Sequence, residues 1–196
     1  MSDGKKNTAI FISGRGSNMQ QLINASLNPD YPAKIIGIIS NKPDAKGLEI
    51  AKAHNIETAI ILPKDFLDKK ATDEAISKQL EQWNTDIICL AGYMRLLGKD
   101  FCKKWQGKII NVHPSLLPKY KGLDTHKRAI AASEIEHGCT VHFVTHEMDD
   151  GPNIGQVIVP IEMGDDAQAL EKRVLKAEHH LYAWALEQVA LDKIKF

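Results

Sequence analysis

Asn111 and His113 lie two residues apart in the stretch Ile109-Ile-Asn111-Val-His113-Pro114, and both side chains favour chemistry at an acyl carbon. Because side chains alternate along a strand, an extended stretch places the amide and the imidazole on the same side. Pro114 disfavours a helical conformation at His113. A carboxamide and a protonated imidazole side by side both donate hydrogen bonds to a carbonyl oxygen that is becoming an oxyanion. The alternative is a histidine that only caps a turn.

A histidine with this role needs a neighbouring carboxylate that orients the ring and favours its charged form. Two aspartates occur in the segment Met148-Asp149-Asp150-Gly151-Pro152, where a Gly-Pro turn can present a side chain over the end of a sheet. Asp149 is the better candidate, and Asp150 is the alternative. Spacing alone does not decide between the two.

A glycine-rich turn, Ser13-Gly-Arg-Gly-Ser-Asn18, follows the first predicted strand and precedes a helix. Backbone N–H groups at such a helix N-terminus favour an anion. The dinucleotide fingerprint requires a third glycine where this sequence has Met19, and an acidic residue where the second strand ends in Ser40-Asn41. The turn therefore indicates a single phosphate rather than NAD. The alternative is a capped turn without a ligand.

Patterns typical of metal sites and disulfides do not occur. His137, His142 and His146 have no recognised ligand spacing with Cys or Glu, so we expect no metal. The three cysteines are odd in number and form no Cys-x-x-Cys pair, which indicates reduced packing residues.

Composition and charge exclude several classes of protein. The 196 residues are 43% apolar and 26% charged, which is typical of a globular chain with a substantial core. The 25 Lys and Arg residues balance 25 Asp and Glu residues, so no nucleic-acid partner is expected. No apolar run approaches the roughly 18 residues that span a bilayer, and the N-terminus lacks a signal sequence. We expect a cytoplasmic protein that acts on small molecules and has no membrane partner.

Short β-branched runs alternate with amphipathic stretches in the first half of the chain, which predicts strand-helix repeats. Strands are predicted at 9–12, 35–39, 58–62, 87–90 and 109–112. Helices are predicted at 19–26, 45–54, 71–83 and 99–105. Runs at 139–144 and 156–161 predict antiparallel additions to the sheet. A long final helix is predicted from 167 on by an apolar stripe made of Leu170, Val174, Ala177, Leu181, Trp184 and Val189.

The alternation predicts an α/β fold, because parallel strands need helical crossovers that cover both faces of their sheet. No repeat or linker divides residues 1–196, so we expect one domain. Its expected architecture is Rossmann-like, with a mostly parallel sheet flanked by helices and antiparallel additions in the C-terminal half. The predicted site residues fall at the carboxyl ends of strands, where open α/β sheets bind ligands.

In this order along the chain, the motifs resemble the formyltetrahydrofolate-dependent formyltransferase family, and within it the phosphoribosylglycinamide formyltransferases. The resemblance runs from about Ala9 to Ala185, and its most specific element is Asn-x-His-Pro-Ser-Leu-Leu-Pro at 111–118. The other matching segments are Gly-Ser-Asn at 16–18, Ala-Gly-Tyr-Met-Arg-Leu-Leu at 91–97, His-Phe-Val-Thr at 142–145 and Asp-Asp-Gly-Pro at 149–152.

The resemblance implies transfer of the formyl group of 10-formyltetrahydrofolate, a co-substrate, to the amine of phosphoribosylglycinamide in de novo purine biosynthesis. The residues themselves indicate direct attack by the amine, with the oxyanion stabilised by Asn111 and protonated His113, and no covalent enzyme intermediate is required. Asn111, His113 and Asp149 match the family's catalytic residues, which favours Asp149 over Asp150. Three alternatives remain. The first is a hydrolase that passes the formyl group to water, the second is a formyltransferase that acts on another amine, and the third is a non-catalytic nucleotide-binding module.

The resemblance also implies two sets of binding residues. The substrate set comprises Gly16, Ser17, Asn18 and, on the ribose hydroxyls, Glu178. The folate set comprises Lys69, Met94, Arg95, Leu96, Leu97, Asn111, Val144, Thr145 and His146.

Two positions depart from the family pattern. Leu175 stands where relatives have a Lys or Gln near the phosphate, and His146 replaces a usual acidic residue. Either a monomer or a homodimer is compatible with the sequence.

Overall fold

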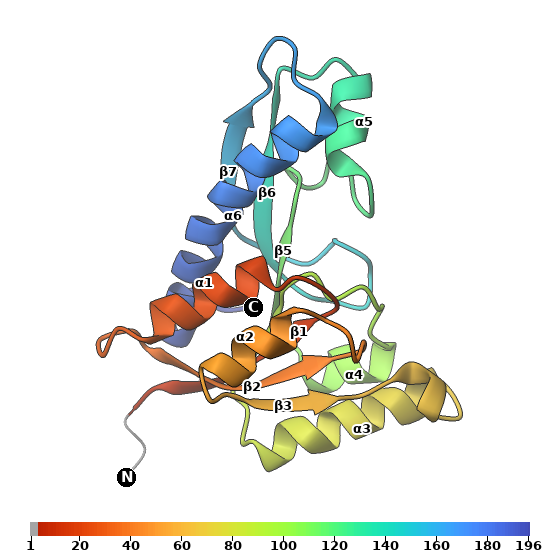
Figure 1. Ribbon diagram of the computed structural model, residues 1–196, viewed down its shortest axis with the longest axis vertical. Coiled ribbons are helices and arrows are strands. Elements are labelled where there is room, and N and C mark those ends of the chain that lie inside the picture. Colours follow the sequence, from red (N-terminus) through yellow and green to blue (C-terminus); the bar gives the residue numbers. More distant parts are fainter. Residues whose placement is uncertain (1–3) are drawn as a thin grey trace.

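The computed structural model describes residues 4–196, and at their centre lies a seven-stranded sheet with the strand order β3-β2-β1-β4-β5-β6-β7 (Figure 1). Neighbours from β3 to β5 pair in parallel, whereas β6 and β7 are added antiparallel. The strands are β1 (Lys6–Ile12), β2 (Ala33–Ser40), β3 (Glu57–Ile60), β4 (Ile87–Leu90), β5 (Ile109–His113), β6 (Glu136–Phe143) and β7 (Asn153–Pro160). This arrangement confirms the predicted fold class.

Helices cover both faces of the sheet, as Figure 1 shows. One core contains the apolar faces of α1, α2 and α6, and the other contains those of α3 and α4. The helices are α1 (Ser17–Ser26), α2 (Gly47–Ala53), α3 (Lys69–Gln82), α4 (Lys99–Lys104), α5 (Thr125–Ala131) and α6 (Ala167–Ala190), with a 3-10 turn η1 (Pro63–Asp65).

Local sequence explains why β1 lies inside the sheet and where α3 and α6 begin. The last four residues of β1 are fully buried, which is typical of a parallel strand packed on both faces. Asp68 caps α3 by accepting a hydrogen bond from the Ala71 N–H at 2.7 Å, and Asp166 caps α6 in the same way through Ala169. Each cap satisfies an N–H group that has no partner within its helix.

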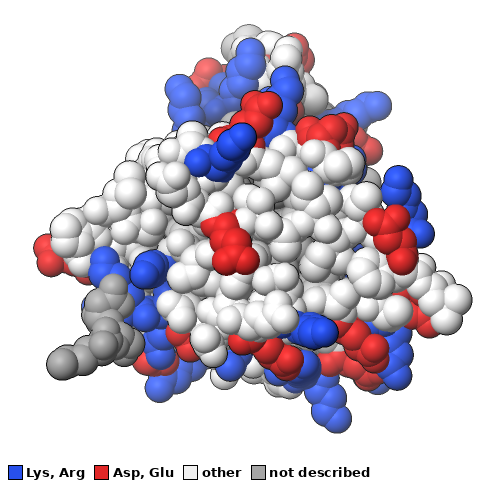
Figure 2. Space-filling view, turned by 60° about the horizontal axis from the view of Figure 1, so that its bottom comes forward, with Lys and Arg blue, Asp and Glu red and all other residues white. Residues whose placement is uncertain are grey.

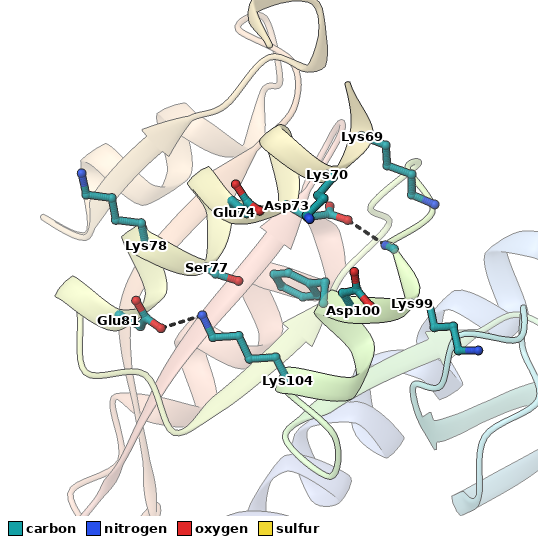
Figure 3. Close-up of a pocket in the computed structure, with 12 residues that line it drawn as sticks. Lys69, Lys70, Asp73, Glu74, Ser77, Lys78, Glu81, Lys99, Asp100 and Lys104 are labelled. Carbon is teal, nitrogen blue, oxygen red and sulfur yellow. Dashed lines mark hydrogen bonds and ion pairs between the residues drawn. The ribbon is translucent and has the colours of Figure 1, made fainter. Parts of the chain in front are cut away.

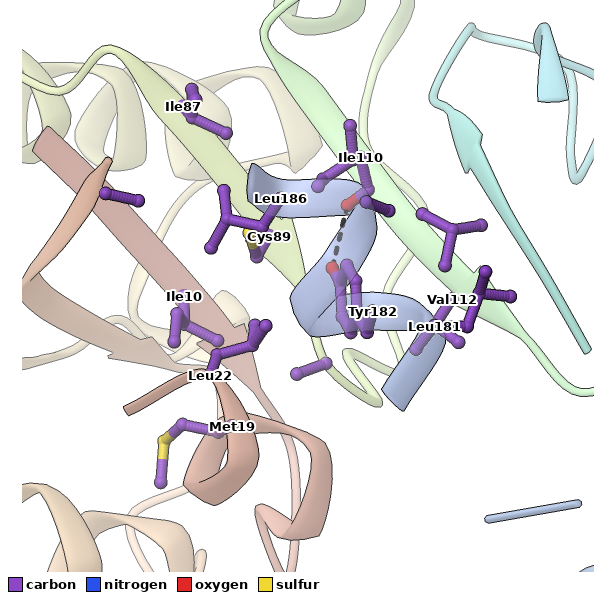
Figure 4. Packing of buried hydrophobic residues seen from close by; sticks show 14 of the residues in the cluster. Ile10, Met19, Leu22, Ile87, Cys89, Ile110, Val112, Leu181, Tyr182 and Leu186 are labelled. Carbon is purple, nitrogen blue, oxygen red and sulfur yellow. Dashed lines mark hydrogen bonds between the residues drawn. The ribbon is translucent and has the colours of Figure 1, made fainter. Parts of the chain in front are cut away.

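Tyr182 anchors α6 to the middle of the sheet (Figure 4). Its side chain is fully buried, and its hydroxyl lies 3.0 Å from the backbone oxygen of Leu90 and 3.1 Å from that of Ile110. The hydroxyl donates to these carbonyls at the adjoining strands β4 and β5. Burial raises the pKa of Tyr182 well above its usual value, so the hydroxyl stays a donor. The anchor fixes α6, which carries Glu178, over the strands that end at the site.

Three sequence predictions need correction. Helix α5, the seven residues Thr125–Ala131 between β5 and β6, was not predicted. Strand β3 ends at Ile60 rather than at 62, shortly before the 3-10 turn that begins at Pro63. Trp184 was assigned to the buried stripe of α6 but is 42% exposed. Its ring lies over Gly155 of the edge strand β7, where solvent reaches it.

The strand order creates a crevice above the sheet. Because β2 lies on one side of β1 and β4 on the other, the chain leaves the carboxyl ends of β1 and β4 in opposite directions. Ligands of open α/β sheets bind at such a reversal of strand order. Strand β5 is the next neighbour of β4 and ends at His113, so the predicted phosphate loop and the predicted catalytic pair face one crevice.

Candidate active site

His113, the last residue of β5, lies beside Asp149. Its Nδ1 is 3.4 Å from Oδ2 of Asp149, and the two side chains are only 7% and 12% exposed. The other ring nitrogen, Nε2, is 2.9 Å from the backbone oxygen of Tyr120. Since a carbonyl oxygen only accepts hydrogen bonds, Nε2 carries a proton. The structure thus brings Asp149 to the histidine, whereas Asp150 is exposed and pairs with Lys121.

The turn that carries Asp149 is tightly constrained. Asp149 has a left-handed backbone with φ 50°, and its Oδ2 accepts a hydrogen bond from the Gly122 N–H at 2.9 Å. Two residues further, Gly151 approaches β6 so closely that a Cβ there would lie 1.8 Å from the backbone oxygen of Phe143. Only glycine fits this approach, and it directs the turn back over the end of the sheet.

Asn111 contacts a second histidine, His142 of β6. Its Nδ2 is 3.2 Å from Nε2 of His142, while Nδ1 of that ring is 2.8 Å from the backbone oxygen of Phe143. Nδ1 therefore donates to the carbonyl and Nε2 accepts from the amide. Burial lowers the pKa of His142, which favours this neutral ring. The contact fixes the amide and leaves its second N–H free.

The sequence analysis missed this contact of His142, which it rejected as a metal ligand and otherwise used only as part of the matching segment 142–145. Asn111 and His142 are direct partners in the antiparallel pairing of β5 with β6. No local pattern encodes that register. The alternation within 111–113 was the available signal, and it identified only one of the two strands.

Asn111, His113 and Asp149 line a cavity of about 660 Å³ at the carboxyl ends of β4 and β5. Glu178 and Leu175 of α6 form part of its wall. The other lining residues are Gly92, Tyr93, Met94, Arg95, Leu96, Val112, Pro114, Gly122, Leu123, Asp124, Thr125, His126, Met148 and Glu171. Several of the apolar ones are exposed, including Met94, Leu96, Leu123 and Met148. The main cavity therefore combines an apolar mouth with polar groups at its base, as binding sites for small molecules do.

The glycine-rich turn encloses a smaller cavity of about 240 Å³, which shares Gly92 and Met94 with the main cavity. Its wall is formed by residues 13–18 together with Ala91. Gly16 has a left-handed backbone with φ 76°, and a Cβ there would lie 3.0 Å from Cα of Gly47. The turn leads directly into α1, so its N–H groups are placed for an anion.

Glu178 connects the glycine-rich turn to α6. Its side chain is buried, and its Oε2 accepts a hydrogen bond from Nδ2 of Asn18 at 2.7 Å. Burial raises the pKa of Glu178 to about 7, although the bond from Asn18 favours the charged form. The carboxyl group therefore changes its protonation near neutral pH, at the wall of the main cavity.

Most of the predicted folate residues line the main cavity or a neighbouring cavity of about 110 Å³. The neighbouring cavity lies between the loop after β4 and the loop after β6, and it shares Asn111 and Asp149 with the main one. Its predicted folate residues are Arg95, Leu96, Leu97, Asn111, Val144, Thr145 and His146. Met94 lines the main and phosphate cavities.

Lys69 lies elsewhere, in a groove of about 430 Å³ between α3 and α4 (Figure 3). Lysines and carboxylates alternate along this groove, and Glu81 pairs with Lys104 at 2.6 Å. The catalytic candidates do not line it. Arg95 connects the two regions, because its guanidinium pairs with the buried Asp73 at 2.6 Å and donates to the backbone oxygen of Lys69 at 3.1 Å. The charge of Arg95 is thus already paired.

Charges of both signs surround the face shown in Figure 2. This mixture differs from the continuous basic surface that follows nucleic-acid phosphates. Within residues 4–196 no group of three or more His, Cys, Asp or Glu side chains is arranged to hold a metal ion. In the same part of the chain, no helix has the length and apolar content needed to cross a membrane.

The chain is similar to proteins of known family and structure. A formyl transferase family model matches residues 6–186. Phosphoribosylglycinamide formyltransferase of Haemophilus influenzae is 46% identical over 90% of this chain and 84% of its own length. The crystal structure of phosphoribosylglycinamide formyltransferase from Brucella melitensis is 49% identical, covers 95% of this chain and 96% of its own, and superposes with a TM-score of 0.92.

Longer proteins match as well. The trifunctional purine biosynthetic protein adenosine-3 of Bos taurus is 43% identical over 97% of this chain, which spans only 19% of that protein's length. The matches cover both the glycine-rich turn and the segment from Asn111 to Asp149. This chain belongs to the formyl transferase family.

Proposed function

We propose that this chain transfers the formyl group of 10-formyltetrahydrofolate to the amine of phosphoribosylglycinamide, a step of de novo purine biosynthesis in the cytoplasm. One observation carries the proposal. Asn111, His113 and Asp149 line one cavity, and this cavity shares the lining residues Gly92 and Met94 with the cavity at the glycine-rich turn. A phosphorylated amine bound at the loop can therefore extend towards the catalytic candidates.

The two substrates would approach these residues from different sides. The phosphate would bind the N–H groups of residues 16–18, and the ribose hydroxyls would meet Glu178. The folate would occupy the cavity between the loops after β4 and β6, with its formyl group towards Asn111 and Asp149. Asn111 lines both the main cavity and this folate cavity, so the amine and the formyl carbon would meet beside it.

The reaction begins when the amine nitrogen attacks the formyl carbon and the carbonyl oxygen becomes an oxyanion. The free N–H of Asn111 donates to this oxygen. Protonated His113 has acceptors at both nitrogens, Asp149 and the Tyr120 carbonyl, and contributes its positive charge beside the oxyanion. The bond from carbon to the folate nitrogen then breaks, and the proton lost by the amine passes through water to that nitrogen.

The two departures from the family pattern have local consequences. Leu175 lines the main cavity with an apolar side chain and offers no donor to a phosphate, while Lys176 is exposed. The phosphate contacts would therefore come from the loop after β1. His146 lines the neighbouring cavity but is largely exposed, and its Nε2 lies 3.1 Å from Oε1 of Glu147.

An absorbance assay of the folate, run with and without phosphoribosylglycinamide, tests the proposal. We expect tetrahydrofolate to form only when that amine is present. Tetrahydrofolate formed without it would identify a hydrolase and refute the proposal. Turnover with a different amine but none with phosphoribosylglycinamide would refute the proposed acceptor while keeping formyl transfer. His113→Ala should abolish most turnover with little change in KM, because the ring acts on charge that develops in the transition state.

A further inference from the structure

The loop of residues 119–124, between β5 and α5, contacts both members of the His113–Asp149 pair. The backbone oxygen of Tyr120 accepts from Nε2 of His113, and the Gly122 N–H donates to Oδ2 of Asp149, each at 2.9 Å. That same Oδ2 faces Nδ1 of the histidine at 3.4 Å. A displacement of this loop would therefore move the histidine and its carboxylate together.

The loop backbone needs support from its surroundings. Tyr120 and Asp124 have left-handed backbone conformations, with φ 56° and 57°, which residues other than glycine rarely adopt. Such conformations persist where neighbouring contacts hold them. The hydroxyl of Ser115 donates to the Lys119 backbone oxygen at 2.6 Å and holds the inner end of the loop.

Glu134 and Arg128 hold the outer side of the 119–124 loop by hydrogen bonds to residues 119–121. Glu134 accepts hydrogen bonds from the Tyr120 hydroxyl at 2.8 Å and from Nζ of Lys119 at 2.9 Å. These two donors lower the pKa of Glu134, so it stays a carboxylate at neutral pH. Arg128 donates to the backbone oxygen of Lys121 at 2.7 Å, and its guanidinium lies 5.2 Å from the centre of the Tyr120 ring.

Neither Glu134 nor Arg128 lines the main cavity, the phosphate cavity or the folate cavity. We propose that both are positioning residues for His113, which hold the Tyr120 carbonyl against Nε2 and thereby leave Nδ1 facing Asp149. The proposal rests on the formyl-transfer function proposed above. It assigns to an ion-paired surface cluster the task of holding the imidazole ring in the orientation that pairs Nδ1 with Asp149.

Kinetics of Glu134 variants test this assignment. Glu134→Ala removes the acceptor for Tyr120, and we expect kcat to fall about tenfold while KM for both substrates changes by less than about twofold, because small misplacements of a catalytic group are costly. Glu134→Gln keeps an oxygen that accepts from the hydroxyl and should restore most of kcat. Glu136→Ala, an exposed carboxylate two residues further along, is the matched control and should behave as wild type. Arg128→Ala should also lower kcat, and Lys127→Ala should not.

NMR of the His113 ring gives a readout independent of turnover. In the wild type, the Nε2 proton should exchange slowly with solvent because it bonds to the Tyr120 carbonyl. In Glu134→Ala this signal should broaden or vanish while the melting temperature changes little. Tyr120→Phe removes only the hydroxyl, should reproduce both effects, and carries the test if Glu134→Ala does not fold.

An unchanged kcat and an unchanged His113 signal in Glu134→Ala would overturn the inference. A fall in kcat accompanied by an equal rise in KM would also overturn it, since that pattern indicates a disturbed binding cavity. A wild-type protein inactive with both substrates would refute the proposed function instead. The NMR comparison would still decide the positioning role in that case.

Discussion

In the proposed reaction, replacement of Asn111 by Ala removes the neutral hydrogen-bond donor to the reacting carbonyl. The amide is fixed, because Nδ2 donates to His142 at 3.2 Å and that ring is itself held by the Phe143 carbonyl at 2.8 Å. One N–H is thereby used, and the other is free for the oxyanion. Loss of a single preorganised donor of this kind costs about 2.7–4 kcal/mol of transition-state stabilisation, or about 10² to 10³ in kcat.

Two further variants, Asn111→Asp and His142→Phe, test whether Asn111 acts by donating a hydrogen bond or only by its packing. Asn111→Asp keeps the shape but turns an acceptor towards the lone pair of His142 and towards the oxyanion, so its kcat should fall at least as far as that of Asn111→Ala. His142→Phe removes the acceptor that orients the amide, and we expect a smaller fall in kcat, on the order of tenfold. His180→Phe on α6, an exposed position, is the matched control.

The assay is steady-state absorbance of the folate with each substrate varied in turn, which separates kcat from KM. Circular dichroism of each variant establishes that it is folded. A kcat of Asn111→Ala within about threefold of wild type, with the loss confined to KM, would refute the reasoning, because uniform binding affects KM alone. Wild-type turnover in His142→Phe would show that the amide needs no support from that ring.

Three further predictions concern stability and the turn at Asp149. Burial raises the pKa of Glu178 from 4.5 to about 7, which contributes to the free energy of unfolding an increment that is fully present below pH 4.5 and is lost as the pH rises through 7. Urea unfolding at several pH values should show this decline in the wild type and a flatter pH profile in Glu178→Gln. Gly151→Ala should displace the Asp149 turn, because the new Cβ meets the Phe143 carbonyl at 1.8 Å, and kcat should fall more than KM rises; an unchanged kcat would contradict this. Tyr182→Phe should lower the free energy of unfolding by about 1–3 kcal/mol, as measured by denaturant titration, since the Leu90 and Ile110 carbonyls lose a buried donor.

Local patterns in the sequence were enough to predict the parallel half of the sheet and the side chains that meet at the end of β5. The run at 87–90 matches β4 in full, because a strand buried on both faces is uniformly apolar. The alternation at Asn111 and His113 likewise predicted two side chains directed to one side, and both line the main cavity. The glycine-rich turn was recognisable because it needs residues that tolerate a left-handed backbone and a close approach, as Gly16 does.

Contacts between distant segments depended on the tertiary structure. The register of β6 against β5 brings His142 to Asn111, and a register shifted by one residue would turn it to the other face. The choice of Asp149 over Asp150 beside His113 follows from a left-handed turn that spacing does not encode. Lys69, expected among the folate residues, begins α3 in a separate groove, because the turn before that helix sets where it starts. The sequence by itself determined that the side chains of Asn111 and His113 emerge together at the main cavity, since residue type and periodicity are local properties. Their partners were decided by strand order and loop closure, which arise only when the whole chain packs.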